Sequence, residues 1–307
     1  MFNNLDNIEM NLNQLYKDVI NREKNEKIKK GFFLFNKLKL IFSYLCYKLK
    51  LHNRLVNSGL SVNWLKEFLK FWHTILNGRP IDVPDFHYLR MNYRLRFQNI
   101  GIINEKDQDS FICTWQKPET MYLLLSTVYN YGRTNYLNFL PILKYLPKKA
   151  TILEYGCGIA PITQGLIKYM PHRKYEFTIL DILQINFLYA IFSLGKYENV
   201  NYRILDPFKN CINNKDKYNV IICQQVLEHL PNPLEVVKSF FQCLELNGLF
   251  IFDYIKGAGQ GLDSMNSVRQ RESVLQYILM NSKILYGKIN ANVDVKWTVV
   301  VKNSHVN

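Results

Sequence analysis

Short apolar runs alternate with amphipathic stretches through the second half of the chain. The runs are rich in β-branched and aromatic residues, which indicates buried strands, and the stretches between them have the apolar spacing of helices. Strands are predicted at 151–155, 175–180, 201–205, 218–223, 249–254 and 293–301, with 284–289 as the candidate for one more. One helix is predicted to begin at residue 161, and three more are predicted at 185–194, 233–246 and 264–279. This alternation predicts an α/β fold with a doubly wound parallel sheet.

The first half of the chain lacks this alternation. Residues 1–80 have helical spacing, and 119–131 and 134–146 predict two further helices. The segment 90–97 alternates with period 2, which predicts an accessory strand that pairs with 111–115. We therefore expect a mainly helical N-terminal extension over residues 1–147, followed by the sheet domain over 148–307.

Apolar residues and lysines are mixed over residues 29–51 in a pattern typical of a basic amphipathic helix. Such a helix can pack its apolar face on the rest of the fold, with lysines that reach outward to solvent. It can also lie on an anionic membrane surface. Both interpretations stay open from the sequence.

A glycine turn follows the strand predicted at 151–155. Gly156 and Gly158 lack a Cβ, so they can adopt positive φ and let a ligand approach the backbone. Pro161 then suits the first turn of a helix. Strand, turn and helix together predict the start of a nucleotide-binding βαβ unit. Glu154 would repel a pyrophosphate, whereas it suits the cationic amino group of S-adenosylmethionine.

The run Glu154-Tyr-Gly156-Cys-Gly158-Ile-Ala160 resembles the first motif of the class I S-adenosylmethionine-dependent methyltransferases. Ala160 replaces the third glycine of that motif. The triplet Leu227-Glu228-His229 looks like the small-molecule branch, which includes ubiquinone-biosynthesis O-methyltransferases. The resemblance covers about residues 150–255.

The resemblance implies a Rossmann-like methyltransferase sheet with the cofactor at the carboxyl ends of its strands. Asp181 would accept the ribose hydroxyls, Asp206 would meet the adenine amino group, and Gln224 would lie near the methionine end. Either aspartate could instead cap the helix that follows it. The full set of expected cofactor residues is Glu154, Gly156, Cys157, Gly158, Asp181, Ile182, Asp206 and Gln224.

Methyl transfer to a hydroxyl requires an aligned nucleophile and removal of its proton. His229 is the candidate general base, because an unperturbed histidine titrates near pH ~6.5. The alternative is that His229 only forms a hydrogen bond with the backbone. The aromatic run that leads into the first strand of the sheet supplies the acceptor and lid candidates, which are Trp115, Gln116 and Tyr122.

The net charge of +14 lies mainly in the first half, where residues 1–150 carry 23 Lys or Arg against 12 Asp or Glu. Nucleic acid is a disfavoured partner, because Gln224-Gln225-Val226 lacks the Asn/Asp-Pro-Pro-aromatic run of amino-directed nucleic-acid methyltransferases. The six cysteines show no metal-ligand spacing, so we expect no metal site. Free thiols and the absence of a signal-peptide pattern predict a cytoplasmic protein.

These observations predict a methyltransferase that acts on a small-molecule or sugar-type acceptor, such as a glycan precursor. Peripheral contact with the inner face of an anionic membrane stays open. Two alternatives remain: a non-catalytic cofactor-binding or membrane-associated scaffold subunit, and an NAD-dependent oxidoreductase.

Overall fold

The computed structural model describes residues 64–98, 100, 108–134, 136–206, 212, 215–257 and 262–303. The basic segment 29–51 therefore lies outside the described residues. The chain forms two compact units that interleave along the sequence: residues 1–98 and 118–135 form one, and residues 99–117 and 136–307 form the other. By packing, 99–117 and 136–147 belong with the sheet.

The first unit is helical in its described part. It contains α4 (Trp64–Thr74), α5 (Val83–Phe97), the 3-10 turn η1 (Pro118–Thr120) and α7 (Met121–Arg133). Trp64 and Phe68 of α4 pack edge-to-face on Phe86 of α5, with ring centroids 5.2 and 5.1 Å apart. The helix predicted at 119–131 is thus confirmed as α7.

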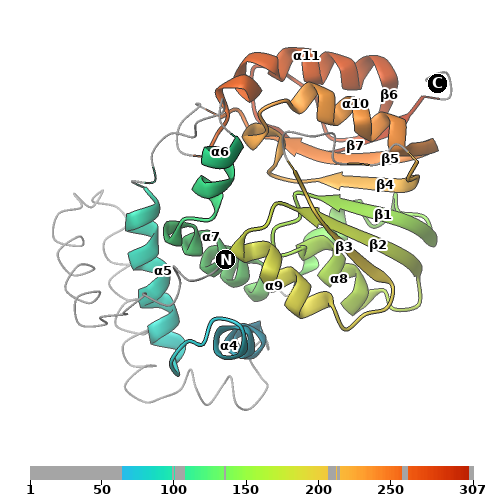
Figure 1. Ribbon diagram of the computed structural model, residues 1–307. Helices are drawn as coiled ribbons and strands as arrows, with labels where there is room; N and C mark the ends of the chain where they lie inside the picture. The colour runs from blue at the N-terminus through green and yellow to red at the C-terminus, as the bar shows by residue number, and fades with distance from the viewer. Residues whose placement is uncertain are drawn as a thin grey trace, which may run out of the picture. The chain divides into compact units, whose positions relative to one another are not determined.

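The strand predicted at 90–97 is wrong, because these residues form the C-terminal half of α5 (Figure 1). The Asp82 side chain accepts from the Asp85 amide at 2.9 Å and the Asp85 side chain accepts from the Asp82 amide at 3.3 Å, a capping box that starts the helix upstream. The buried residues Phe86, Leu89 and Tyr93 then follow helical spacing. The alternation of apolar and polar residues at 90–97 is therefore coincidental, and the helical spacing over the whole of α5 determines the structure.

Two other predictions for this region also fail. The partner strand at 111–115 is the helix α6 (Gln108–Trp115), and 134–146 contains only the 3-10 helix η2 (Leu137–Ile142). Pro141 lies inside η2, and a proline removes a backbone donor that a longer helix would need.

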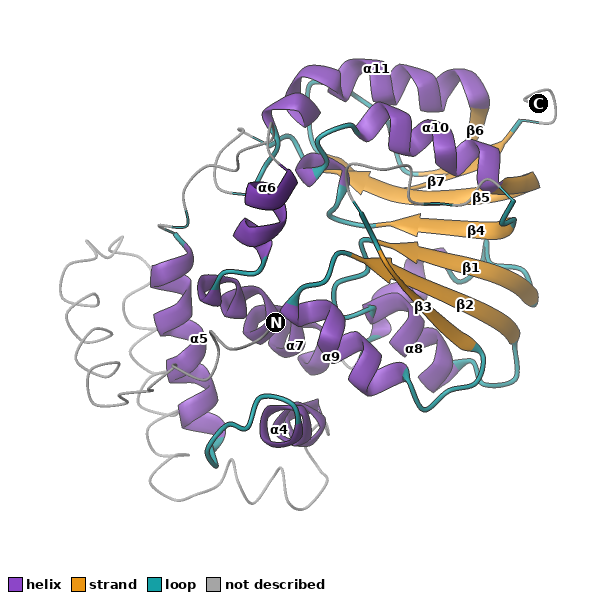
Figure 2. Cartoon of the chain, in the orientation of Figure 1, coloured by secondary structure: helices purple, strands orange, loops and turns teal. Residues whose placement is uncertain are grey.

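The second unit contains a seven-stranded sheet in the order β3-β2-β1-β4-β5-β7-β6, which confirms the predicted doubly wound fold (Figures 1 and 2). Strands β1 to β5 run parallel and β7 is antiparallel to β5 and β6. The strands are β1 (Lys149–Tyr155), β2 (Lys174–Asp181), β3 (Val200–Ile204), β4 (Tyr218–Cys223), β5 (Leu244–Tyr254), β6 (Ser282–Tyr286) and β7 (Val295–Lys302).

Different helices cover the two faces of the sheet. Residues of α8 (Pro161–Tyr169), α9 (Ile185–Leu194) and η2 join one apolar cluster with side chains of β1 to β5 and β7. On the other face, Phe240 of α10 (Pro233–Cys243) contacts Tyr155 and Phe250, and α10 runs beside α11 (Met265–Asn281) (Figure 2). Alternate side chains of one strand therefore pack on opposite faces of the sheet. The carboxyl ends of the parallel strands β1, β2 and β4 lie together at one edge of the sheet.

The close approach of α8 to η2 generates a stability prediction. A Cβ at Gly165 would overlap the carbonyl oxygen of Tyr136 and the ring of Phe139. We expect Gly165→Ala to lower the free energy of unfolding by about 1–3 kcal/mol in urea denaturation, since overpacking outweighs the gain in helix propensity. Lys168→Ala, at an exposed position of the same helix, should stay within about 0.5 kcal/mol of the parent. Equal stabilities for the two variants would contradict the close approach.

Candidate functional site

The glycine turn after β1 has the conformation that its sequence predicts. Gly156 has φ 61° and Gly158 has φ 54°. A Cβ at Gly156 would overlap the side chain of Val226, which follows β4, so this glycine permits close packing. A Cβ at Gly158 would meet only the Asn186 amide nitrogen, at 3.9 Å. The space beside Gly158 is therefore open on the ligand side of the turn.

Asp181 ties this turn to the end of β2. Its Oδ2 accepts from the Gly158 amide at 2.6 Å, and its Oδ1 accepts from the Ile182 amide at 2.7 Å and from the Gln184 side chain at 3.0 Å. Asp181 is only 4% exposed, and burial raises its pKa to about 6. The sequence-predicted residues Gly158, Asp181 and Ile182 thus lie together at one edge of the sheet.

Two buried amides beside Asp181 were missed by the sequence analysis. Gln184 and Asn186 begin α9, and among the described residues no donor lies within hydrogen-bond distance of Gln184 Oε1 or Asn186 Oδ1. Buried acceptors are normally paired, so both positions suit hydroxyl or amino donors of a ligand. Their only sequence signal is their place just after the acidic end of β2.

Glu154 occupies a different environment from the one expected. Its carboxylate accepts from the Ile162 amide at 3.3 Å, and from the amide and hydroxyl of Thr163 at 2.9 and 2.6 Å. It therefore satisfies donors at the start of α8, where a negative charge is also favoured by the helix dipole. Burial raises the pKa of Glu154 to about 7. Contact with the cofactor's amino group stays a prediction that must compete with these three bonds.

The remaining predicted cofactor residues lie near the same strand ends. Cys157 is buried in the turn, and its amide donates to the Leu180 carbonyl at 3.2 Å. Asp206 follows β3 and is half-buried, as is Gln224, which follows β4. The structure places these side chains at the expected strand ends, and their ligand contacts stay predictions.

A second buried carboxylate, missed by the sequence analysis, holds the segment after β4. Asp253, near the end of β5, accepts from the Gln225 amide at 2.5 Å, and Gln225 has φ 53°. A left-handed conformation is uncommon for a residue with a side chain, so this bond offsets local strain. Asp253 is 4% exposed, and burial raises its pKa to about 7.

His229 lies in the 3-10 turn η3 (Leu227–His229) with its Nδ1 2.9 Å from the Leu262 carbonyl oxygen and 3.4 Å from Asp263 Oδ1. A carbonyl oxygen only accepts, so Nδ1 carries the proton of the neutral ring and Nε2 keeps its lone pair. Burial lowers the pKa of His229 from its ordinary value, which favours this neutral form. The hydrogen bond between His229 and the backbone, which was the alternative to a role as base, is therefore present. It leaves Nε2 able to accept a proton.

Trp115 and Gln116 reach both sides of this edge from α6 and the residue after it. The ring of Trp115 packs edge-to-face on His229 with centroids 5.3 Å apart. Gln116 Nε2 donates to the carbonyl of Leu183, just beyond Asp181, at 2.7 Å. Tyr122 lies on α7 in the other unit, where its ring packs against Phe97. The structure thus brings Trp115 and Gln116 to the site region, and Tyr122 stays a prediction.

Comparison with known proteins gives a family match, similar curated proteins and similar solved structures. Residues 130–281 match the family model described as a methyltransferase domain. Ubiquinone biosynthesis O-methyltransferase of Hydrogenovibrio crunogenus is 26% identical over 102 residues, which are 33% of this chain and 41% of the relative. The same enzyme of Rickettsia canadensis is 28% identical over 107 residues, 35% of this chain and 43% of the relative. The chain thus spans about two fifths of the length of these curated relatives.

One similar solved structure is the N-methyltransferase NodS from Bradyrhizobium japonicum, determined in complex with S-adenosyl-L-homocysteine. It is 14% identical with a TM-score of 0.42, and the match covers 56% of this chain and 87% of NodS.

The buried carboxylate of Asp253 generates a pH prediction. Its folded-state pKa of about 7 exceeds the ordinary 3.8, so its contribution to stability is full at low pH and is lost as pH rises through 7. We define the stability difference as the free energy of unfolding of Asp253→Asn minus that of the parent. This difference should be more positive at pH 8 than at pH 5, by up to about 3 kcal/mol. Urea denaturation at intermediate pH values checks this. A parent–variant difference that does not change with pH would contradict it.

The glycine turn, the acidic end of β2 and the match of residues 130–281 to a methyltransferase domain agree with one another, so this part of the chain is similar to the family that its motifs resemble.

Proposed function

We propose that this protein transfers a methyl group from S-adenosylmethionine to a hydroxyl of a small-molecule acceptor. The observation that carries the proposal is the arrangement around Gly158. Open space lies beside its backbone, the Asp181 carboxylate is fixed next to it, and the acceptors of Gln184 and Asn186 face the same region unpaired within the described structure.

These residues fit the adenosine half of the proposed cofactor. Ribose hydroxyls are donors, and Asp181, Gln184 and Asn186 together offer acceptors beside the glycine turn. NAD also contains a ribose that Asp181 could bind, but its pyrophosphate would lie at the glycine turn close to Glu154, and negative charges repel at short range. When bound, the cofactor supplies an electrophilic methyl carbon on a sulfonium.

His229 supports a role as general base. Its Nδ1 proton is directed at the Leu262 carbonyl, so Nε2 is the nitrogen that takes the acceptor's proton. Asp263, 3.4 Å from Nδ1, stabilises the imidazolium that results. Trp115 packs edge-to-face with the His229 ring and restricts its orientation. Proton removal from a hydroxyl is consistent with the O-methyltransferase names of the curated relatives.

The acceptor is proposed to meet Trp115 and Gln116. In the described part of the chain, no acceptor lies within hydrogen-bond distance of the buried Trp115 Nε1, which makes it available to an oxygen of the methyl acceptor. Tyr122 stays a prediction as an acceptor residue, and a sugar-type acceptor remains within this proposal. No helix among the described residues is long and apolar enough to cross a bilayer. Membrane contact by residues 29–51 stays a prediction.

Calorimetric titration tests the cofactor. We expect S-adenosylhomocysteine to bind and NAD to give no heat of binding. Asp181→Asn should weaken S-adenosylhomocysteine binding about tenfold or more, since hydrogen bonds to charged groups contribute roughly 1.5–3 kcal/mol. Glu176→Gln, at an exposed position of the same strand, should leave affinity unchanged. Binding of NAD without S-adenosylhomocysteine would favour the oxidoreductase alternative.

Turnover with catechol as acceptor tests His229. We expect His229→Gln to lose about 10²–10⁴-fold in rate while S-adenosylhomocysteine affinity is retained. Because burial lowers the pKa of His229, the parent's rate should fall only below pH ~6.5. His172→Gln, at an exposed position, is the matched control and should keep the parent's rate. Full turnover by His229→Gln would remove His229 from the mechanism.

A further inference from the structure

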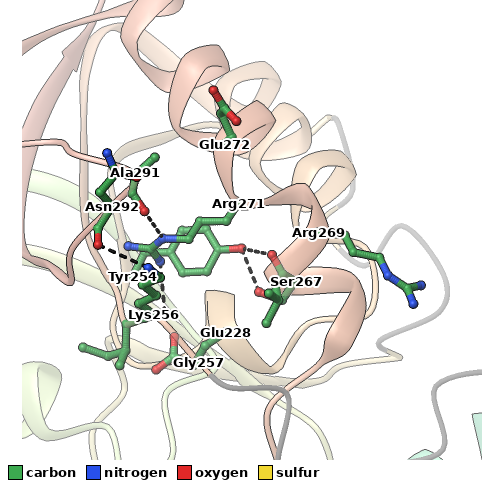
Figure 3. A pocket seen from close by; sticks show the side chains of 12 residues that line it. Glu228, Tyr254, Lys256, Gly257, Ser267, Arg269, Arg271, Glu272, Ala291 and Asn292 are labelled. Carbon is green, nitrogen blue, oxygen red and sulfur yellow. Dashed lines mark hydrogen bonds between the residues drawn. The ribbon is translucent and has the colours of Figure 1, made fainter.

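A cavity of about 240 Å³ lies between the end of β5, the first turns of α11 and the residues that precede β7 (Figure 3). None of the residues lining it belongs to the predicted cofactor set. Its volume is below the roughly 300–1,000 Å³ of typical ligand pockets, so it suits a small molecule.

The walls of the cavity are held by contacts within the protein. Arg271 of α11 donates to the carbonyls of Ile255, Ala291 and Val293 at 3.0, 3.3 and 2.8 Å. Its guanidinium also lies over the ring of Tyr254, 4.5 Å from the centroid (Figure 3). One side chain thus joins three segments, and the cavity exists before any ligand binds.

The buried polar groups of the wall are paired with one exception. The Tyr254 hydroxyl donates to the Ser267 carbonyl at 2.9 Å, and the Ser267 hydroxyl donates to the Leu227 carbonyl at 2.8 Å. Glu228 is only 5% exposed, yet across the described residues nothing lies within hydrogen-bond distance of its Oε2. A buried carboxylate oxygen without a partner is costly, so this atom marks where a ligand group would be stabilised.

The chemistry of that group follows from the surroundings of Glu228. Burial raises the pKa of Glu228 to about 7, so both the acid and the carboxylate are present near neutral pH. A hydroxyl can donate to the carboxylate or accept from the acid, whereas an ammonium can only donate. Two exposed basic residues, Lys256 and Arg269, and one exposed acid, Glu272, also line the cavity, so the exposed charges of the lining favour an anionic group farther from Glu228.

We propose that this cavity is a binding site for a small hydroxylated anion, whose hydroxyl pairs with Glu228 and whose charged group is attracted by Lys256 and Arg269. Tyr254, Ile255 and Val268 supply apolar surface for the body of the ligand. The test measures binding to the protein without cofactor, so its outcome is separate from the outcome of the methyl-transfer tests.

The probe is 3-hydroxybenzoate, titrated calorimetrically into the full chain beside benzoate, which lacks the hydroxyl, and 3-hydroxybenzyl alcohol, which lacks the charge. We expect 3-hydroxybenzoate to bind about tenfold or more tightly than either analogue. Equal affinity for 3-hydroxybenzoate and benzoate, or no binding of 3-hydroxybenzoate at millimolar concentration, would overturn the proposal.

A variant pair locates the effect. Glu228→Leu removes the unpaired carboxylate, so it should raise the melting temperature of the ligand-free protein and abolish the preference for 3-hydroxybenzoate over benzoate. Glu272→Leu removes an exposed acid from the same lining and should keep that preference. Retention of the hydroxyl preference in Glu228→Leu would overturn the proposal. If Glu228→Leu does not fold, the probe series in the parent decides.

Discussion

The hydrogen bond from the Gly158 amide to the Asp181 carboxylate is the contact on which the candidate site depends. It joins the turn after β1 to the end of β2, and the backbone carbonyl of Asp181 also accepts from the Leu205 amide at 2.7 Å, just beyond β3. The positions of three strand ends are thereby linked through one residue. Burial of this carboxylate disfavours its charged form and so raises the pKa of Asp181. The burial places Asp181 beside Gln184 and Asn186, whose oxygens, unpaired among the described residues, can accept from a ligand.

The other side of the edge repeats this arrangement with a different strand pair. Asp253 near the end of β5 fixes Gln225 after β4, and His229 follows within the same segment. Both carboxylates bond to a backbone amide across neighbouring strands, and both are buried. Regular sheet structure thus ends in irregular backbone at two points, each stabilised by a hydrogen bond from a backbone amide to a buried carboxyl group. This preorganisation is what a site for group transfer requires.

The sheet was predictable because its strands are buried on both faces and therefore form continuous apolar runs with turn residues between them. Asp181 and the glycines were predictable because their chemistry is tied to a position along one strand and its turn. Gln184, Asn186 and Asp253 were missed, since their importance depends on partners that only the folded chain brings close. The error at 90–97 arose because the capping box at Asp82 and Asp85 sets the local structure from outside that window. Glu154 has the residue type and position expected of a cofactor contact, yet its carboxylate accepts hydrogen bonds from the start of α8.

The interleaving of the two units has a consequence for synthesis on the ribosome. Residues 99–117 of the sheet unit emerge between two segments of the helical unit, long before the residues they contact. Trp115 cannot contact His229, and Gln116 cannot bond to Leu183, until those later residues have been synthesised. All residues of the first unit have emerged once residue 135 is synthesised, so this unit can fold first during translation, before α6 has the sheet unit to pack on. The part of the chain nearest the proposed acceptor is therefore ordered late, when β4 arrives.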